Sequence, residues 1–194
     1  MRRIGKIPQN YPPLSLSGNL AEYIGVVLGD GNISKFPRTE RIIISANSNN
    51  LGFVNRYTKL TKQIFNKKPT VSKVYNKNNI RIGLYQKEIS KRLGIPSGDR
   101  GRLNIKTPNW ILKNQSYLIR YLRGLFEAEG SLSVHKPTCT YNFQFSNKNQ
   151  SLLKNVENGL KLLGYNPEIR KTSTRLRKKL EVEKFRKLIK FRVY

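Results

Sequence analysis

The sequence predicts an α+β protein of two similar halves, each with the order helix, two strands, helix, two strands, short helix. The first observation behind this prediction is a repeat, since Tyr23–Gly31 aligns with Leu122–Gly130, 99 positions further along. The second is that Ile44–Leu51 aligns with Phe145–Leu152 in the same order, at an offset of 101. The third is the alternation of apolar and polar residues typical of half-buried strands, which follows each copy. Loop insertions explain such small offset changes, so the halves are expected to fold alike.

Each repeated segment is expected to lie on a helix. Asn19 and Glu22 have the spacing of a capping box, which predicts Asn19 as the N-cap of the first helix. The turn-forming pair Asp30-Gly31 predicts that this helix ends near Gly29. Its counterpart is expected from about Ser116 to Gly130.

The other elements of the first half follow in order. Arg41–Ser45 is the expected strand, although three consecutive isoleucines obscure its alternation. A helix is expected at Asn49–Phe65, a strand around Ile80–Tyr85 and a short helix at Gln86–Leu93.

The second half shows the clearer strand patterns. Ser131–His135 and Tyr141–Ser146 both alternate, and a helix carrying Leu152–Leu163 follows. Arg175–Arg177 is expected in a strand and Glu181–Lys190 in the closing helix.

The segment joining the halves is rich in glycine, proline and basic residues. This composition predicts a linker at residues 95–113, between an N-terminal half at 1–94 and a C-terminal half at 114–194. The linker is too short to separate independent domains, so one compact unit is expected.

Charge is the strongest compositional signal. The chain has 38 Lys and Arg against 11 Asp and Glu, a formal net charge of +27, so a polyanion is the expected partner. An anionic membrane surface fits less well, because no apolar run approaches the ~20 residues that a spanning helix needs. No apolar stretch follows the basic start Met1–Lys6, so a signal peptide is not expected and the predicted location is intracellular.

The single Cys139 and the single His135 exclude an internal disulfide and a zinc cluster of the His/Cys kind. They also make Cys–His and Ser–His–Asp catalysis untenable. Any catalysis is therefore expected from carboxylates, lysines or a hard metal ion.

Both motif helices carry an interior glycine, Gly25 and Gly124. Such a glycine costs about 1 kcal/mol relative to alanine, and close approach of two backbones is the usual compensation. Helices crossing at these glycines would place Asp30 beside Glu129. Two carboxylates at negative helix ends are unfavourable unless a divalent cation lies between them, which predicts a Mg²⁺ site. A plain helix-ending turn would explain either acid alone, but less readily both.

Tyr23–Gly31 and Leu122–Gly130 resemble the two motifs of the LAGLIDADG homing endonucleases of single-chain type. The resemblance covers nearly the whole chain, because the element order is met twice. It implies two halves related by a pseudo-twofold axis, with antiparallel sheets forming a saddle over DNA and the motif helices at the centre. It also implies a monomer, needing no protein partner, that cuts both strands of a long asymmetric double-stranded target and leaves 3′ overhangs. The implied cofactor is Mg²⁺ or Mn²⁺, with Ca²⁺ binding without supporting cleavage.

Carried over by position, Asp30 and Glu129 are the metal-binding acids, and the carbonyls of Gly29 and Ala128 could complete the ligand shell. The family often places a basic or amide residue just after the second strand of each half. Offset alignment puts Lys148 and Asn47 there.

Lys148 could polarise water or stabilise transition-state charge, or it could simply neutralise a phosphate. The absence of a matching lysine in the first half makes the predicted mechanism asymmetric.

Strand alternation predicts which side chains face the DNA, because Tyr141, Phe143 and Phe145 are expected in the core. Amides can read adenine and arginines guanine in the major groove. The residues expected on the DNA face are Asn32, Ser34, Arg41, Ile43, Ser45, Arg81, Tyr85, Ser131, Ser133, His135, Asn142, Gln144, Ser146, Arg170, Arg175 and Arg177. Four cations expected at loops or strand ends, and more suited to phosphates, are Lys35, Arg38, Lys73 and Lys77.

Other functions fit the sequence less completely. An RNA-binding intron maturase on the same scaffold is the main alternative, and a DNA-binding regulator that has lost cleavage is another. Both acids are retained, which favours cleavage over these two. An intein is disfavoured, because neither end of the sequence carries the nucleophile and the His-Asn residues that protein splicing needs. A ribosomal or chromatin protein would explain the charge but not the repeat.

Overall fold

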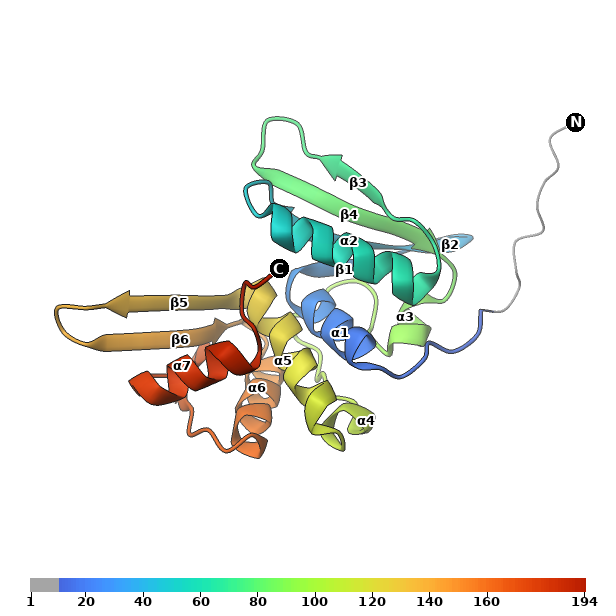
Figure 1. Ribbon diagram of the computed structural model, residues 1–194. Coiled ribbons are helices and arrows are strands. Elements are labelled where there is room, and N and C mark those ends of the chain that lie inside the picture. The colour runs from blue at the N-terminus through green and yellow to red at the C-terminus, as the bar shows by residue number, and fades with distance from the viewer. Residues whose placement is uncertain (1–10) are drawn as a thin grey trace, which may run out of the picture.

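The computed structural model describes residues 11–194, so the first ten residues of the predicted N-terminal half lie outside the described part. The chain forms two halves of the same construction (Figure 1). The elements of the first half are α1 (Gly18–Asp30), β1 (Gly31–Phe36), β2 (Thr39–Asn47), α2 (Leu51–Phe65), β3 (Thr70–Lys73), β4 (Asn79–Gln86) and α3 (Ile89–Leu93).

A connecting segment with one short helix, α4 (Asn109–Leu112), leads into the second half. The elements of that half are α5 (Gln115–Glu129), β5 (Gly130–His135), β6 (Thr140–Ser146), α6 (Gln150–Leu162), β7 (Glu168–Arg170), β8 (Ser173–Leu176) and α7 (Lys179–Leu188). The predicted αββαββα order is therefore confirmed in both halves.

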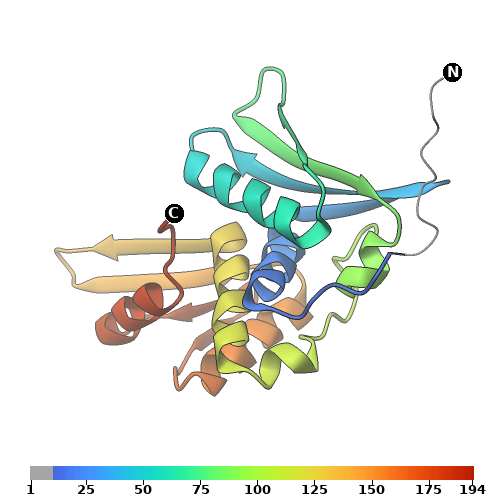
Figure 2. The same ribbon diagram turned by 45° about the vertical axis from the view of Figure 1, so that its right-hand side comes forward.

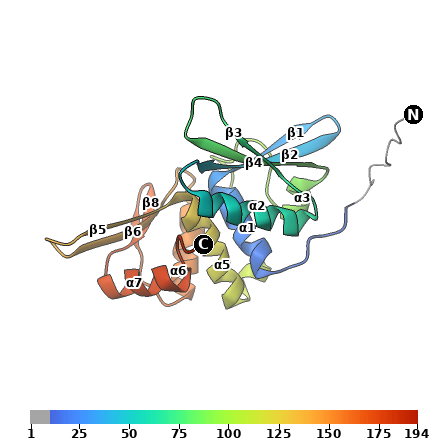
Figure 3. The ribbon, with the colours of Figure 1, turned by 45° about the horizontal axis from the view of Figure 1, so that its top comes forward.

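The two sheets have the same topology. Each has four antiparallel strands, in the orders β1-β2-β4-β3 and β5-β6-β8-β7. The register also repeats, because Gly31 pairs with Ile44 and Gly130 pairs with Phe145. Helices α2 and α3 lie beneath the first sheet, and α6 and α7 beneath the second (Figure 3). The strand residues that point away from these helices form the two outward sheet faces.

Helices α1 and α5 cross at the centre of the molecule (Figure 2). A Cβ atom added to Gly25 would lie 3.1 Å from the Cα of Gly124 and 3.0 Å from the nitrogen of Leu125. One added to Gly124 would lie 2.7 Å from the nitrogen of Val26 and still closer to the carbonyl oxygen of Glu22. Only glycine allows this approach, so the predicted crossing at Gly25 and Gly124 is confirmed.

The cores of the halves differ in composition. The first sheet packs aliphatic residues inward, among them Ile33, Ile42 and Ile82, which are at most 2% exposed. The second half is built around Phe126, whose ring lies 4.8 Å from that of Phe143 and 5.1 Å from that of Phe185 between centroids. Paired aromatic rings bury large apolar areas, so the shorter strands of this half still support a core.

The capping-box prediction was wrong. The N-cap of α1 is Ser17, whose Oγ accepts a hydrogen bond from the nitrogen of Leu20 at 3.2 Å. Glu22 is fully buried and paired with arginines instead of reaching back to the helix start. Two closing helices also differ slightly from expectation, since α3 begins only at Ile89 and α7 already begins at Lys179.

Candidate functional site

The C-terminal ends of α1 and α5 bring the two motif acids together. A Cβ atom on Gly29 would lie 3.1 Å from the Cγ of Glu129, so the small residue at this position lets the helix ends touch. Asp30 and Glu129 are both half-buried. Burial, and then the charge of Glu129, raise the pKa of Asp30 to about 7. Burial also raises the pKa of Glu129.

An asparagine lies near the C-terminal end of each motif helix. Asn47 lines the same hollow as Asp30, and Asn147 donates from Nδ2 to Oε1 of Glu129 at 3.5 Å. The Oδ1 atoms of the two asparagines accept from the backbone nitrogens of Asn49 and Asn149, at 2.9 and 2.8 Å. By its hydrogen bond, Asn147 is therefore the counterpart of Asn47 in the second half. The sequence alignment had paired Asn47 with Lys148 instead. Asn147 was missed because the strand before it is shorter than its counterpart.

An arginine holds the C-terminal end of each motif helix, and neither was predicted. Arg100 donates from Nη2 to the carbonyl oxygens of Val27 and Gly31, at 2.9 and 2.6 Å. Arg192 lies near the end of α5, with Nη2 3.5 Å from the carbonyl oxygen of Gly130. Cations at helix C-termini offset the negative end of the helix dipole. Burial lowers the pKa of Arg100, which keeps its charge all the same.

Two hollows flank the helix ends. The larger, of about 380 Å³, is lined by Asp30, Asn47 and Arg192 together with Ala128. The smaller, of about 260 Å³, is lined by Gly29, Arg100 and Asn147 among others. Each hollow thus combines a motif-helix end from one half with polar side chains from the other half or its flanking segments.

The donor set of the helix ends suits a hard divalent cation. The two carboxylates are only partly compensated, as the raised pKa of Asp30 indicates, and amide and carbonyl oxygens lie around them. Magnesium prefers such oxygen ligands and usually keeps several waters. Within residues 11–194 there is no cluster of three or more His, Cys, Asp or Glu residues suited to a metal. Any ion here would therefore depend on these two acids, with waters or substrate oxygens as further ligands.

Two other predicted site residues have different surroundings. Ala128 lines the larger hollow and its Cβ faces Gly29, so both residues lie at the contact of the helix ends. Lys148 is exposed in the turn between β6 and α6, two residues beyond the end of β6.

The outward face of the first sheet carries most of the residues predicted there. On this face Arg41 lies opposite Tyr85 and Ser34. Ile43 lies opposite Asn32, and Ser45 lies opposite Arg81. All of these side chains point away from α2. The Cζ of Arg41 lies 5.4 Å from the ring centroid of Phe36 and 5.8 Å from that of Tyr85. Cation–π contacts of this kind hold the guanidinium in place on the sheet.

The outward face of the second sheet is polar and contains an ion-paired cluster. Gln144 pairs across the strands with Ser131 and Arg175, and Asn142 pairs with Ser133. Glu168 accepts from Arg175 at 3.0 and 3.1 Å, and its carboxylate also pairs with Arg170. The remaining predicted residues of this half, at strand positions or just beyond them, are His135, Ser146 and Arg177.

The four predicted phosphate contacts divide into two pairs. Arg38 and Lys77 lie in turns, whereas Lys35 and Lys73 lie within β1 and β3. Register puts Lys35 opposite Glu40 and Lys73 opposite Ile80, on the helix-covered side of the sheet rather than the outward face. Four further outward residues were not predicted: Thr70 and Ser72 on the edge strand β3, Ser173 on β8 and Thr140 at the start of β6. Strands of four residues such as β3 and β8 give no detectable alternation, and Thr140 precedes the alternating run that begins at Tyr141.

No helix in the described part of the chain combines the length and apolarity needed to span a membrane. Comparison with curated protein sequences found no match. Residues 116–191 match the family model for the LAGLIDADG-like domain. The second half of the chain is therefore a LAGLIDADG-like domain, which confirms the resemblance seen in the repeated motif.

Solved structures extend this match to most of the chain at the level of the fold. The homing endonuclease I-DmoI in complex with DNA and Mn superposes with a TM-score of 0.61 at 20% identity, covering 89% of this chain and 96% of that one. The N-terminal LAGLIDADG domain of DUF199/WhiA gives 0.60 at 19% identity, covering 93% and 86%. Full-length DUF199/WhiA from Thermatoga maritima gives 0.61 at 19% identity, with 57% of that chain covered. The chain thus shares a fold with a homing endonuclease and with WhiA.

Proposed function

We propose that this protein is a monomeric, site-specific endonuclease that hydrolyses both strands of a long, asymmetric double-stranded DNA target. The observation that carries the proposal is the pair Asp30 and Glu129, held together where two crossing helices meet between two sheets. A protein that only binds DNA gains nothing from two carboxylates close to a phosphate, because they repel it.

Nucleic-acid binding is supported by charge and by surface chemistry. The net charge of +27 would attract a polyanion, and the two outward faces present arginine, amide and hydroxyl groups. Among related folds, I-DmoI has been crystallised with DNA. Since the two faces carry different side chains, the proposed target is not palindromic.

Asp30 and Glu129 would hold a divalent cation, with Mg²⁺ or Mn²⁺ as the proposed cofactor. When bound, such an ion would supply positive charge to a phosphate and acidify a water molecule. I-DmoI has been studied with Mn and, separately, with Ca. Carbonyl oxygens of Gly29 and Ala128 are the proposed additional ligands.

The side chains around the acids have separate proposed roles. With a pKa of about 7, Asp30 can hold a proton on its carboxyl group near neutral pH and must release it to act as a full anion. Asn147 orients the carboxylate of Glu129 through its 3.5 Å contact. Arg100 and Arg192 hold the helix ends in register and add positive charge beside them. Lys148, which follows β6, is the residue proposed to stabilise charge developing on the phosphate.

The test is selection of cleaved molecules from a randomised DNA library in the presence of Mg²⁺. The expected result is enrichment of one extended site cut on both strands with 3′ overhangs. Asp30→Asn and Glu129→Gln should each abolish cutting and leave binding of the selected site largely intact. Enrichment of bound but uncut sites by the unaltered protein would contradict the proposal.

A further inference from the structure

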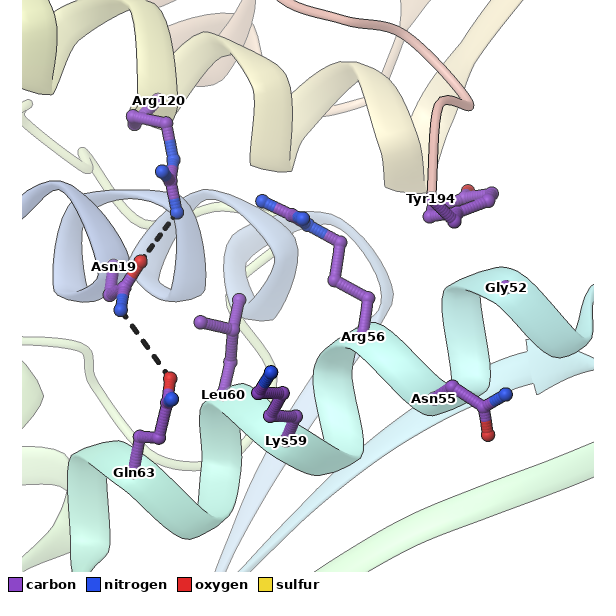
Figure 4. A pocket seen from close by; sticks show the side chains of 9 residues that line it. All are labelled: Asn19, Gly52, Asn55, Arg56, Lys59, Leu60, Gln63, Arg120 and Tyr194. Atoms are coloured by element: carbon purple, nitrogen blue, oxygen red, sulfur yellow. Dashed lines mark hydrogen bonds between the residues drawn. The ribbon is translucent and has the colours of Figure 1, made fainter.

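A further hollow, lined in part by basic side chains, lies away from the outward sheet faces. It has a volume of about 590 Å³ and is bordered by α1, α2 and α5 (Figure 4). Helix α2 covers the inner side of the first sheet, so DNA lying on the outward faces would not reach this hollow (Figure 3). The site proposed above leaves it without a role.

Two arginines of this hollow, Arg56 and Arg120, are fixed in place by a buried carboxylate. Glu22 is 0% exposed and accepts from Arg56 Nη2 at 2.8 Å. Glu22 also pairs with the Nε atoms of Arg56 and Arg120. These bonds use only part of each guanidinium. Locked guanidinium groups lose little conformational entropy when they bind an anion, unlike free surface arginines.

Positive charge is in excess here. Glu22 and Glu127 are the two buried carboxylates, and they are met by three guanidinium groups, those of Arg56, Arg120 and Arg123. Lys59 adds a fourth cation at the wall of the hollow, and no acidic side chain within residues 11–194 forms an ion pair with it. An anion of one or two charges would balance the cluster.

The remaining walls suit a nucleotide better than a bare anion. The amides of Asn19, Asn55 and Gln63 line the hollow, and Asn19 is held between Arg120 and Gln63 by hydrogen bonds of 2.6 and 3.4 Å (Figure 4). Tyr194, a half-exposed aromatic ring, stands at the other end. Amides can pair with base edges and an aromatic ring can stack on a base, while the volume lies in the range of small-ligand sites.

We propose that this hollow binds a nucleotide through its phosphate, as a site separate from the outward sheet faces. The nucleotide could be a free mononucleotide or one unit of a single-stranded nucleic acid, because both present the same phosphate, sugar and base. The proposal does not depend on cleavage or on Asp30 and Glu129.

The test follows backbone and side-chain amide signals of the full chain by NMR during titration with a 5′-mononucleotide. The signals of Gly52, Asn55 and Gln63 should shift together in a saturable, salt-sensitive manner. Lys59→Glu should weaken binding at least ~10-fold. Lys62→Glu makes the same charge change on an exposed position of α2 outside the hollow and should weaken it less than ~2-fold. Asp30→Asn should leave it unchanged.

Three results would overturn the proposal. They are absence of saturable shifts at Gly52 and Asn55, equal weakening by Lys59→Glu and Lys62→Glu, and binding of inorganic phosphate as tightly as the nucleotide. A short single-stranded RNA that binds through the same signals more tightly than the mononucleotide would support the proposal and identify a polymer as the source of the nucleotide.

Discussion

The two halves share a backbone plan and differ in the chemistry attached to it. At the helix crossing they are nearly equivalent, because Gly25 faces Gly124 and each helix end carries an acid and a nearby arginine. On the outward faces they diverge. The first half holds Arg41 against aromatic rings, whereas the second holds Arg175 in an ion pair with Glu168. The crossing tolerates little variation for steric reasons, while the sheet faces are free to vary with the proposed DNA target.

The largest expected effect comes from breaking the crossing. Gly124→Ala places a methyl group against the backbone of α1, where no side chain can move aside, and should destabilise the fold by about 3 kcal/mol. The measurement is urea unfolding. Gly159→Ala is the matched control, because its methyl group would meet only leucine side chains at 3.2–3.4 Å and should change stability by less than about 1 kcal/mol. Equal effects would mean that the helices do not cross at Gly124.

The next largest effect concerns the unfavourable burial and mutual repulsion of the two motif carboxylates. The pKa of Asp30 is raised to about 7, so the stability that its protonated carboxyl group contributes is fully present below pH ~4 and is lost as the pH rises through 7. Asp30→Asn removes that loss and should stabilise the metal-free protein at pH 8 by about 2–3 kcal/mol, after discounting for partial exposure. At pH 4 the variant should differ little from wild type.

Thermal unfolding at the two pH values measures this difference. Added Mg²⁺ should stabilise wild type at pH 8 and leave Asp30→Asn unchanged, since the ion favours the ionised pair. A variant less stable than wild type at pH 8 would show that Asp30 is a structural residue.

The asymmetry at Lys148 gives a smaller effect. If Lys148 stabilises charge at one scissile phosphate, Lys148→Ala should slow cleavage of one strand about tenfold and let nicked DNA accumulate. Lys171→Ala removes an exposed cation of the same half from the turn between β7 and β8. If both variants slowed cleavage of both strands equally, Lys148 would be a phosphate contact only.

The smallest effect is expected on the second outward face. Glu168→Gln removes the charge that positions Arg170 and Arg175, so discrimination between bases beneath them should fall by about 1 kcal/mol. Affinity for unrelated DNA should rise slightly, because the outward face of the second sheet loses one negative charge. Competition binding with single-base variants of the selected site measures both effects. Glu183→Gln, on an exposed position of α7, should do neither.

The sequence predicted those features that are encoded locally or by repetition. The fold order and the crossing at Gly25 and Gly124 followed from the repeat, and the outward positions of Arg41 and Gln144 followed from strand alternation. Mid-helix glycine in two aligned segments was an informative signal because it carries a cost that packing must offset.

Features formed by distant residues escaped prediction. Glu22 looked like a helix cap by its spacing, yet Arg56 and Arg120 approach it from other elements and make it a buried counterion. Arg100 and Arg192 have no local pattern, and their equivalence appears only when the helix ends are in place. Lys35 was expected at a loop or strand end and lies within β1 opposite Glu40, so its contact with a phosphate stays a prediction.

The most direct test of the central claim, that the two motif acids form one coupled pair, is an NMR titration of the Asp30 carboxyl carbon. Asp30 should titrate near pH 7 in the metal-free protein, and its pKa should fall in Glu129→Gln because one of its two causes is removed, while burial keeps it above the ordinary value. A saturating divalent cation should keep Asp30 ionised well below pH 7. An Asp30 that titrates near the ordinary aspartate pKa, and is indifferent to both Glu129 and the cation, would contradict the claim.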